Sequence, residues 1–425
     1  MSESIIPVDI DFDLTQPPGR LDRWARKVVT GLFSAITWGR IKVVENAEVT
    51  LFGKSETDDQ PEVTLEILHP RFHSATVCGG SVGLAEAYIS GLWKCSNLTE
   101  LMRILIRNLS VLERVEYGPA WINLCLRKFF HLFHRNTKLG SRKNILAHYD
   151  LGNEFYSLFL DNTMTYSCGI FESELTSLEE ASLAKYKRIC RKLQLGSQDH
   201  VVEIGSGWGG FAIFAAENFG CHVTTTTISE NQYEYTVDMI SRKGLGKKVK
   251  VLKKDYRDIS GRFDKLVSIE MIEAVGHQFM ETFFKTCSNL LKSNGIMALQ
   301  AITITDQRYR QHVRDVDFIK RYIFPGSCLT AVTHICDVIT RSTDLRLIHM
   351  EDITPHYART LRSWRERFFN RIDKVRKMGF PESFIRMWEY YLCYCEGAFR
   401  ERYIGDVQMI LSKPLYRQVP IPGKL

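Results

Sequence analysis

The sequence predicts an α/β fold, in which a mostly parallel sheet carries additional C-terminal helices and is preceded by a small α+β N-terminal domain. From residue 176 onwards, strand-like and helix-like segments alternate, a pattern typical of a parallel sheet with crossover helices. A glycine-rich segment directly follows the first of these strands, where open α/β sheets bind their ligands. The 425 residues, of which 44% are hydrophobic and 25% charged, favour two or three domains and exclude a disordered chain.

The composition also limits the kind of protein and its partners. The run 204–216 has only 13 residues without a charged one, whereas a membrane-spanning helix needs about 20 apolar ones. The N-terminus carries Asp9, Asp11 and Asp13 and lacks an apolar signal core, so a cytoplasmic protein is expected. The 11 cysteines form no C-x-x-C motif, which favours reduced thiols over metal ligands or disulfides. A net charge of +7 permits an anionic partner, but nucleic acid is not expected from it.

The N-terminal part divides into three predicted segments. Residues 1–40 form a lead-in that ends in a helix at about 21–35. Residues 41–110 form the small α+β domain. Apolar and polar residues alternate from 41 to 77 as in strands, and a glycine-rich turn then precedes two helical patterns. Residues 111–147 form a basic helical linker.

The linker has two interpretations. Between 120 and 143 it has six basic residues and no acidic one, interleaved with aromatic side chains such as Trp121, Phe129 and Phe133. An amphipathic helix of this kind can lie on an anionic bilayer with its aromatic residues at the acyl boundary. A helix that connects two domains and buries its aromatic residues in a core has the same pattern. Charge and periodicity do not separate the two.

The remaining chain, 148–425, forms the predicted α/β domain. One helix begins with a capping box of Ser177 and Glu180. The tail from 356 to 410 is predicted to form mainly aromatic-rich helices. Five strand candidates are found in the segments HVVEIGSGWGG, CHVTTTTIS, KVKVLKKD, FDKLVSIEM and GIMALQAIT.

The glycine-rich segment contains Gly205 and Gly207 between a strand and a helix. Glycines there let the backbone pass close to a ligand, and the helix N-terminus offers free N–H groups. Glu203 comes just before them, where a carboxylate could meet a positively charged ligand. The spacing lacks the third glycine of dinucleotide-binding loops, and the next strand, which ends near Thr227, has no acidic residue for a ribose. A tight turn that binds nothing would have the same glycines.

Several ordered segments carry a resemblance to a known family. The segment VVEIGSGWGGFAIFAAENFGCHVTTTTISENQ resembles the S-adenosylmethionine motif of the cyclopropane-fatty-acyl-phospholipid synthase family, which includes enzymes like the mycolic acid cyclopropane synthases. The resemblance covers about 148–410, and SVGLAEAYISGLWKC (81–95) extends it more loosely towards the N-terminus. The other matching segments are HYDLGNEFYSLFLDNTMTYSCGIF (148–171), LKKDYRDI, VSIEMIEAVG (267–276), RYIFPGSCL (321–329) and YCEGAFRERYIGDVQ (394–408).

The resemblance implies a class I methyltransferase domain with a Rossmann-like sheet over 148–425 and a lipid-associated domain over 41–110. The implied enzyme transfers a methylene from S-adenosylmethionine to the double bond of an unsaturated phospholipid acyl chain, forming a cyclopropane ring. In an alternative, the acyl chain is methylated without ring closure and becomes methyl- or methylene-branched. A catalytically silent lipid- or cofactor-binding protein is a third hypothesis, against which the intact glycine motif argues.

The resemblance also implies a set of cofactor-binding residues. Tyr166 and Ser167 would lie beside S-adenosylmethionine, and Gly205 and Gly207 would pass beneath its methionine part with Glu203 next to them. The residues expected on the ribose and adenine side are Thr227, Gln232, Asp255, Tyr256 and Ile269.

A bound bicarbonate is implied as the base that removes a proton before the ring closes. Its expected holders are Cys168, Glu273 and the backbone or side chain at Ile302. A glutamate beside an anion must be protonated or accept a hydrogen bond from it. Taken without the resemblance, Cys168 is a small buried thiol and Glu273 a carboxylate at a helix N-terminus.

Three departures from the family pattern put the ring-closing base in doubt. Ala274 and Gln300 stand where well-known members have histidines, and Arg365 stands where they have a tyrosine. Gln300 can still donate a hydrogen bond to an anion, and Arg365 would attract one if it points inward. Arg365 is equally compatible with a solvated helix face.

The acyl-chain substrate implies peripheral association of a cytoplasmic enzyme with the membrane surface. The basic stretches 120–143 and 362–377 are the expected contact regions, and their binding to anionic lipid should weaken with salt. The sequence leaves the oligomeric state open, with a homodimer as one option.

Overall fold

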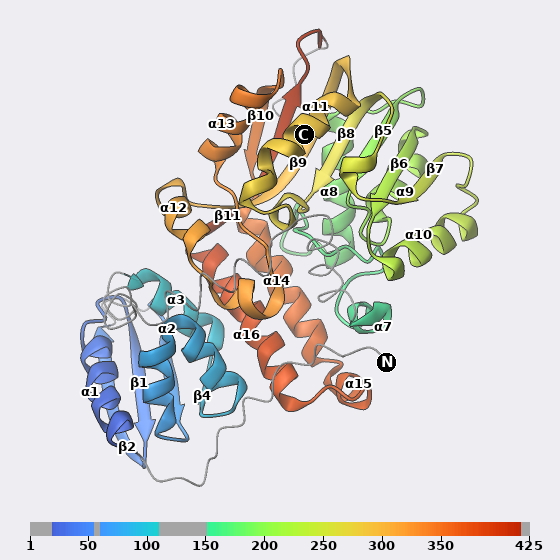
Figure 1. Cartoon of the computed structure of the whole chain (residues 1–425). Helices are drawn as coiled ribbons and strands as arrows, with labels where there is room; N and C mark the ends of the chain where they lie inside the picture. The colour runs from blue at the N-terminus through green and yellow to red at the C-terminus, as the bar shows by residue number, and fades with distance from the viewer. Residues whose placement is uncertain (1–18, 55–59, 110–150, 418–425) are drawn as a thin grey trace. The chain divides into compact units, whose positions relative to one another are not determined.

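The computed structural model describes residues 19–54, 60–109 and 151–417. The chain divides into two compact units (Figure 1). The first takes its described residues from Met1–Phe133, Asp315–Ile323 and Phe369–Tyr403, and the second from His134–Arg314, Phe324–Phe368 and Ile404–Leu425. The predicted linker 111–147, including its basic stretch, lies outside the described residues. The predicted domain boundaries differ from this division, because they assigned 315–323 and 369–403 to the α/β domain.

The first unit is an α+β structure built on a four-stranded sheet. The strands have the order β2-β1-β3-β4, in which β1 pairs with β2 antiparallel and with β3 parallel. Alternate residues of β1 are buried, as expected for a strand whose helices cover one face. The strands and helices of this sheet are β1 (Gly39–Glu45), β2 (Glu48–Lys54), β3 (Glu62–Ile67), β4 (Trp93–Cys95), α1 (Arg20–Ser34), α2 (Arg71–Ile89) and α3 (Leu98–Arg107).

The N-terminal predictions are mostly confirmed, with one correction at α2. The alternating pattern that predicted strands up to residue 77 ends early, because α2 already begins at Arg71. The glycines expected to form a turn lie inside this helix, where Gly80 has a positive φ of 58° and kinks it.

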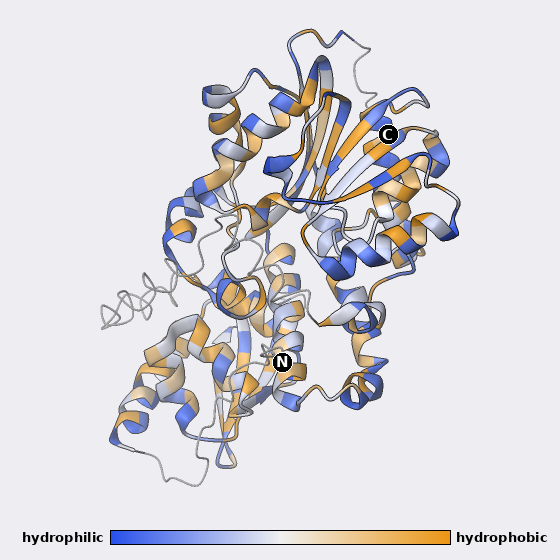
Figure 2. Ribbon diagram, turned by 45° about the vertical axis from the view of Figure 1, so that its right-hand side comes forward, coloured by the Kyte–Doolittle hydropathy of each residue, from blue (hydrophilic) through white to orange (hydrophobic). Residues whose placement is uncertain are grey.

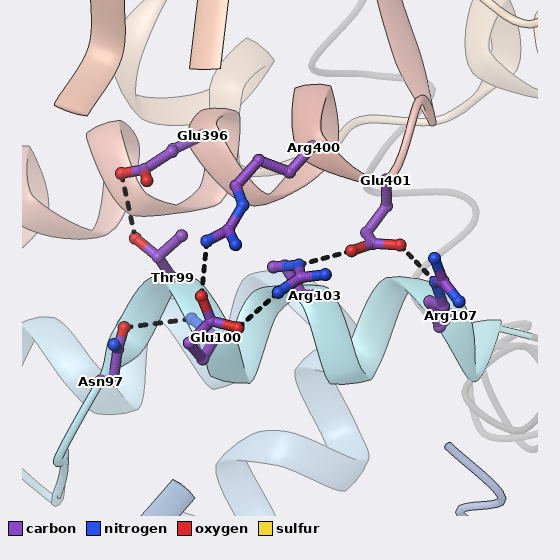
Figure 3. A network of polar contacts seen from close by, with 8 residues as sticks. All are labelled: Asn97, Thr99, Glu100, Arg103, Arg107, Glu396, Arg400 and Glu401. Carbon is purple, nitrogen blue, oxygen red and sulfur yellow. Dashed lines mark hydrogen bonds and ion pairs between the residues drawn. The ribbon is translucent and has the colours of Figure 1, made fainter. Parts of the chain in front are cut away.

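Two segments from the C-terminal third complete the first unit. They contain a π-helical turn (Ile319–Ile323), α15 (Ile372–Lys377) and α16 (Glu382–Arg400). Helix α16 packs closely on α3, since a Cβ atom on Gly397 would lie only 2.8 Å from the Cβ atom of Met102. Polar contacts flank this apolar seam: Glu401 accepts from Arg103 and Arg107, and Arg400 donates to Glu100 (Figure 3).

The second unit is built on a seven-stranded sheet with the order β10-β11-β9-β8-β5-β6-β7. Strands β5 to β9 are parallel to one another, and β11 is antiparallel to both β9 and β10. The strands are β5 (His200–Ile204), β6 (His222–Thr227), β7 (Val249–Lys253), β8 (Phe263–Ile269), β9 (Leu291–Ile304), β10 (Arg346–Asp352) and β11 (Ile404–Ser412).

Helices cover both faces of this sheet. Successive residues of a strand point to opposite faces, so Val201 joins the core with α8 and α9, whereas Val202 joins the core with α11 and α13. Figure 2 shows much of the sheet in the orange of hydrophobic residues. The helices of the second unit are α7 (Gly152–Ser157), α8 (Leu178–Lys192), α9 (Gly210–Phe219), α10 (Glu230–Arg242), α11 (Met280–Leu290), α12 (Asp306–Arg314), α13 (Val332–Ser342) and α14 (Thr354–Phe369). The last residue of α14, Phe369, is counted with the first unit.

All five predicted strands of the α/β domain are present, and the capping box of Ser177 and Glu180 begins α8. The prediction for the tail was wrong at its end, because β11 occupies residues that were expected to be helical. Strand β11 is buried on both faces, so its sequence lacks the alternation of apolar and polar residues that identifies a strand. Among the described helices, none is both long and apolar enough to cross a bilayer.

Candidate active site

The glycine-rich turn follows β5 at the carboxyl end of the parallel strands. Gly205 and Gly207 have positive φ values of 92° and 49°, which glycine adopts readily. The N–H groups of Gly205 and Ser206 both donate to the carbonyl of Thr226, which fixes the turn against β6. A Cβ atom on Gly207 would meet nothing within 4 Å, so the backbone there borders open space. This turn at the N-terminus of α9 fits the methionine part of S-adenosylmethionine.

Glu203 does not lie on this open side. Its side chain is buried and accepts a hydrogen bond of 2.5 Å from the hydroxyl of Thr225 on the neighbouring strand. Burial raises the pKa of Glu203 to about 8, so the group is mostly a neutral acid at pH 7. The structure therefore places Glu203 as a buried partner of β6, and its role towards the cofactor stays a prediction.

The other predicted cofactor residues follow the carboxyl ends of neighbouring strands. Thr227 donates to the amide oxygen of Gln232 at 2.9 Å and accepts from the backbone N–H of Ser229, which orders the turn into α10. Asp255 is held by the guanidinium of Arg257. Tyr256 packs edge-on against Phe283, and Ile269 ends β8 and packs with the α8–α9 core. Their common position at one edge of the sheet agrees with a nucleoside site.

Tyr166 and Ser167 come before the first strand of this sheet in the sequence, and their side chains have aromatic and polar neighbours. The ring centroid of Tyr166 lies 5.0 Å from that of Trp364 and 5.5 Å from that of Tyr156. The hydroxyl of Ser167 accepts a 2.5 Å hydrogen bond from Lys185, whose side chain is completely buried. Burial lowers the pKa of Lys185, while the nearby carboxyl groups oppose this shift.

The centre of the site is Glu270, which the sequence did not single out. Its carboxylate accepts three hydrogen bonds: from the backbone N–H of Cys168 at 2.8 Å, from the Gln300 amide at 2.7 Å and from the Tyr357 hydroxyl at 2.5 Å. Glu270 has a positive φ of 47°, which is uncommon for a residue with a side chain. Its backbone N–H is held by the carbonyl of Gln300. Such strain is typical of functional positions.

Asp406 is the second carboxyl group of this cluster. It is fully buried on β11, and its Oδ2 accepts from the same Gln300 amide at 3.2 Å. Burial, reinforced by the charge of Glu270, raises the pKa of Asp406 well above its ordinary range. Asp406 is therefore expected to keep its proton at neutral pH.

Glu273 and Ile302, which the resemblance names as holders of a bicarbonate, form a separate pair beside the cluster. The backbone N–H of Ile302 donates to Oε1 of Glu273 at 2.5 Å. Oε2 is buried and has no hydrogen-bond partner among the described residues. Burial, together with the charge of Glu270, raises the pKa of Glu273 to about 8. Glu273 is therefore mostly protonated at neutral pH and could donate to an anion.

The structure shows other contacts for the region of two expected anion ligands, Cys168 and Arg365, whose role towards an anion stays a prediction. The thiol of Cys168 contacts the carbonyl of Gly169, and burial raises its pKa well above the ordinary value, so Cys168 contributes through its backbone N–H. On α14 it is Tyr357, eight residues before the half-buried Arg365, that contacts the cluster. The tyrosine that contacts the cluster therefore lies on an earlier turn of α14 than position 365, where well-known members have theirs.

The residues that sequence reasoning missed have little local signal. Tyr357 and Asp406 come from α14 and β11, and only the folded sheet brings them to Glu270. Lys185 is one of several basic residues on an amphipathic helix. Glu270 lies within the segment VSIEMIEAVG that carried the resemblance, where a second acidic residue beside Glu273 was the available signal.

The sheet order, with its antiparallel strand β11, and the glycine turn after β5 define a class I methyltransferase. The chain belongs to the mycolic acid cyclopropane synthetase family, which matches residues 136–409. It is an S-adenosylmethionine-dependent methyltransferase.

Three known proteins illustrate the range of this family. The chain is 37% identical over 341 residues to tuberculostearic acid methyltransferase UfaA1 of Mycobacterium tuberculosis, with 79% of each chain covered. It is 32% identical over 381 residues to cyclopropane-fatty-acyl-phospholipid synthase of Escherichia coli, covering 88% of this chain and 94% of that one. The solved structure of mycolic acid cyclopropane synthase CmaA1 complexed with SAH and CTAB is 28% identical, with a TM-score of 0.60 over 64% of this chain and 98% of that one.

Proposed function

We propose that the enzyme transfers a methyl group from S-adenosylmethionine to the double bond of an unsaturated phospholipid acyl chain, and that its product is methylene-branched. One observation carries this proposal. Cys168, one of the implied bicarbonate holders, and Gln300, which stands where well-known members have a histidine, both donate to the carboxylate of Glu270. The chain therefore supplies its own base. Similarity to both a fatty-acid methyltransferase and a cyclopropane synthase supports the substrate class.

When bound, S-adenosylmethionine supplies an electrophilic methyl group. One alkene carbon forms the new C–C bond, and its neighbour becomes a carbocation. The rings of Tyr166 and Trp364 give this site apolar, electron-rich walls that exclude water and stabilise a cation. A hydride shift moves the cation to the methylated carbon, and Glu270 then accepts a proton from the new methyl group. The result is a C=CH₂ branch, with one methyl gained and one proton lost.

Cyclopropane formation with bicarbonate as base is the second candidate. It differs only in that the proton leaves before any hydride shift, so that the ring closes. The observation that favours it is Glu273, whose protonated carboxyl has a buried oxygen without a partner among the described residues. That oxygen could bind an anion beside the reacting carbons.

Glu270→Gln separates the two candidates. The amide keeps the shape of the carboxylate but cannot accept the proton, so the variant should lose about 10²- to 10⁴-fold in turnover. The measurement is transfer of labelled methyl into unsaturated phospholipid dispersed in detergent, followed by mass spectrometry before and after mild hydrogenation. Glu281→Gln, at an exposed glutamate paired with Lys285, is the matched control.

The expected wild-type product takes up hydrogen at the branch, whereas a cyclopropane resists mild hydrogenation. A ring product whose formation depends on added bicarbonate, and which Glu270→Gln still makes, would replace the first candidate with the second. No label in lipid from the wild-type enzyme would overturn both.

We also propose that the enzyme works peripherally at an anionic membrane surface. Helix α1 of the first unit has an exposed face with Leu21 (54% exposed), Trp24 (46% exposed) and the cations Arg20, Arg23 and Lys27. At 100° per residue these positions share one side of the helix. A basic face with an exposed tryptophan suits the headgroup region. The basic stretch 362–377 was also predicted to contact the membrane. There, by contrast, Arg367 donates to backbone carbonyls and Arg376 pairs with Glu382, so these two cations already have partners within the protein.

Co-sedimentation with phosphatidylglycerol vesicles tests this surface. The double variant Leu21→Ser/Trp24→Ser should bind several-fold more weakly, and added salt should weaken the wild type because a Debye length of about 10 Å at 0.1 M screens the cations. Val49→Ser/Leu51→Ser, at equally exposed positions on β2, is the control. Equal binding of both variants and the wild type would exclude α1 as the membrane contact.

A further inference from the structure

We propose that Lys192, which does not touch Glu270, is a positioning residue that orients the amide of Gln300 towards it through the amide of Gln408. This inference rests on the proposed role of Glu270 as the base. The three side chains that form the connection lie on α8, β11 and β9 of the second unit.

The connection is a continuous chain of short hydrogen bonds. Lys192 Nζ donates to Oε1 of Gln408 at 2.7 Å. Nε2 of Gln408 donates to Oε1 of Gln300 at 3.0 Å, and Nε2 of Gln300 donates to Glu270 at 2.7 Å. Lys192, Gln408 and Gln300 are 0%, 2% and 1% exposed, so water does not compete for these bonds. Gln408 and Gln300 are direct cross-strand partners of β11 and β9, which fixes their separation.

The chemistry of the lysine sets the direction of the whole chain. An ammonium group has three donors and no acceptor, so the group of Gln408 that faces it must be the carbonyl oxygen. The NH₂ group of Gln408 then faces Gln300, and the NH₂ group of Gln300 faces the carboxyl groups of Glu270 and Asp406. Without a fixed donor at the far end, both amides could rotate together. The oxygen of Gln300 would then face two carboxyl groups.

Lys192 is itself held in place. Its Nζ lies 2.5 Å from Oε2 of Glu351 on β10, and Arg188 binds the other oxygen of that carboxylate. His349 is the further titratable group near it. Burial lowers the pKa of Lys192, whereas the hydrogen bond to Glu351 opposes this shift and favours the charged, donor-only form. The pair thus maintains a donor in an interior position where an unpaired charge would be costly.

Gln408→Glu is the most direct test, because it reverses the chain while keeping a partner for Lys192. A carboxylate at 408 only accepts, so Gln300 must turn its NH₂ group away from Glu270 and present its oxygen instead. An oxygen dipole beside a carboxylate disfavours the ionised form. We expect turnover to fall about tenfold or more, the scale of an outer-shell effect, and the acid limb of the pH–rate profile to move to higher pH.

Lys192→Met removes the fixed donor and should also move the acid limb of the pH–rate profile to higher pH. Lys192→Arg should keep the wild-type profile, because arginine, like lysine, only donates. Lys413→Met is the matched control, since Lys413 is a buried lysine whose partners are Asp344 and Ser288. It should lower the melting temperature without moving the profile. All variants are assayed as full chains on detergent-dispersed phospholipid.

Wild-type pH profiles for Gln408→Glu and Lys192→Met, or shifts no larger than that of Lys413→Met, would overturn the inference. This failure is distinct from failure of the proposed function. If Glu270→Gln retains full activity, Glu270 is not the base, whatever the other variants do. If Glu270→Gln is inactive while the Lys192 and Gln408 variants keep the wild-type profile, only the positioning role is wrong.

Discussion

Buried carboxyl groups dominate the site at the scale of single residues. Glu203, Glu273 and Asp406 all have raised pKa values, chiefly because burial penalises their charged forms. Of these, the sequence predicted Glu203 and Glu273 as site residues, and it raised protonation only for Glu273 and only beside a bound anion. Protonation depends on the surrounding dielectric and hydrogen bonds, which are properties of packing between distant segments.

Glu203 gives a prediction about stability. In the folded chain its pKa is about 8, against an ordinary value of 4.5, so between these values the native state holds a proton that the unfolded chain has released. The protonated Glu203 therefore makes its full contribution to the free energy of unfolding below pH 4.5. This contribution is lost as pH rises towards 8, by at most about 1.4 kcal/mol per pH unit. Glu203→Gln, which can still accept from Thr225, should flatten this fall.

The measurement is the urea midpoint of the second unit at several values between pH 5 and 8. Glu281→Gln, an exposed glutamate, should leave the wild-type slope unchanged. A Glu203→Gln protein with the wild-type slope would show that Glu203 does not carry this proton.

Pairs of elements far apart in sequence define both units at the next scale. In the second unit β9 and β11 bring Gln300 and Gln408 into register. In the first unit α16 seats Gly397 against α3, and Glu401 lies between Arg103 and Arg107 (Figure 3). Periodicity located α3 and α16 as helices, but it reports only which face is apolar and not which element covers that face.

Glu401→Gln tests how much the polar rim of this helix pair contributes. The carboxyl group is only 2% exposed and serves two guanidinium groups, so its loss should destabilise the pair by about 1–3 kcal/mol. Hydrogen exchange at the amides of α16 measures this locally. Arg242→Gln breaks an exposed pair with Asp238 and should have almost no effect. Unchanged protection in Glu401→Gln would mean that Glu401 does not contribute to holding α16 on α3.

At the scale of the whole molecule, the α/β fold was predictable, because β5 to β9 alternate with helices and the glycine turn follows the first strand. The cofactor edge was predictable for the same reason, since it needs only strand ends and glycines. The base was not. Glu270 acquires its role from partners on four separate segments, and the resemblance directed attention to the residues that usually hold an anion.

The composition of the first unit also has a consequence for how the chain reaches its native state. The hydrogen bond from Thr99 to Glu396 and the ion pair of Arg103 with Glu401 join residues 297 and 298 positions apart. A contact of this kind closes a very long loop, and its entropic cost must be met before the contact contributes anything. During synthesis, the N-terminal segment with α3 therefore remains without its partner until α16 (Glu382–Arg400) has been made. The domain that begins the sequence is thus completed only near the end of synthesis.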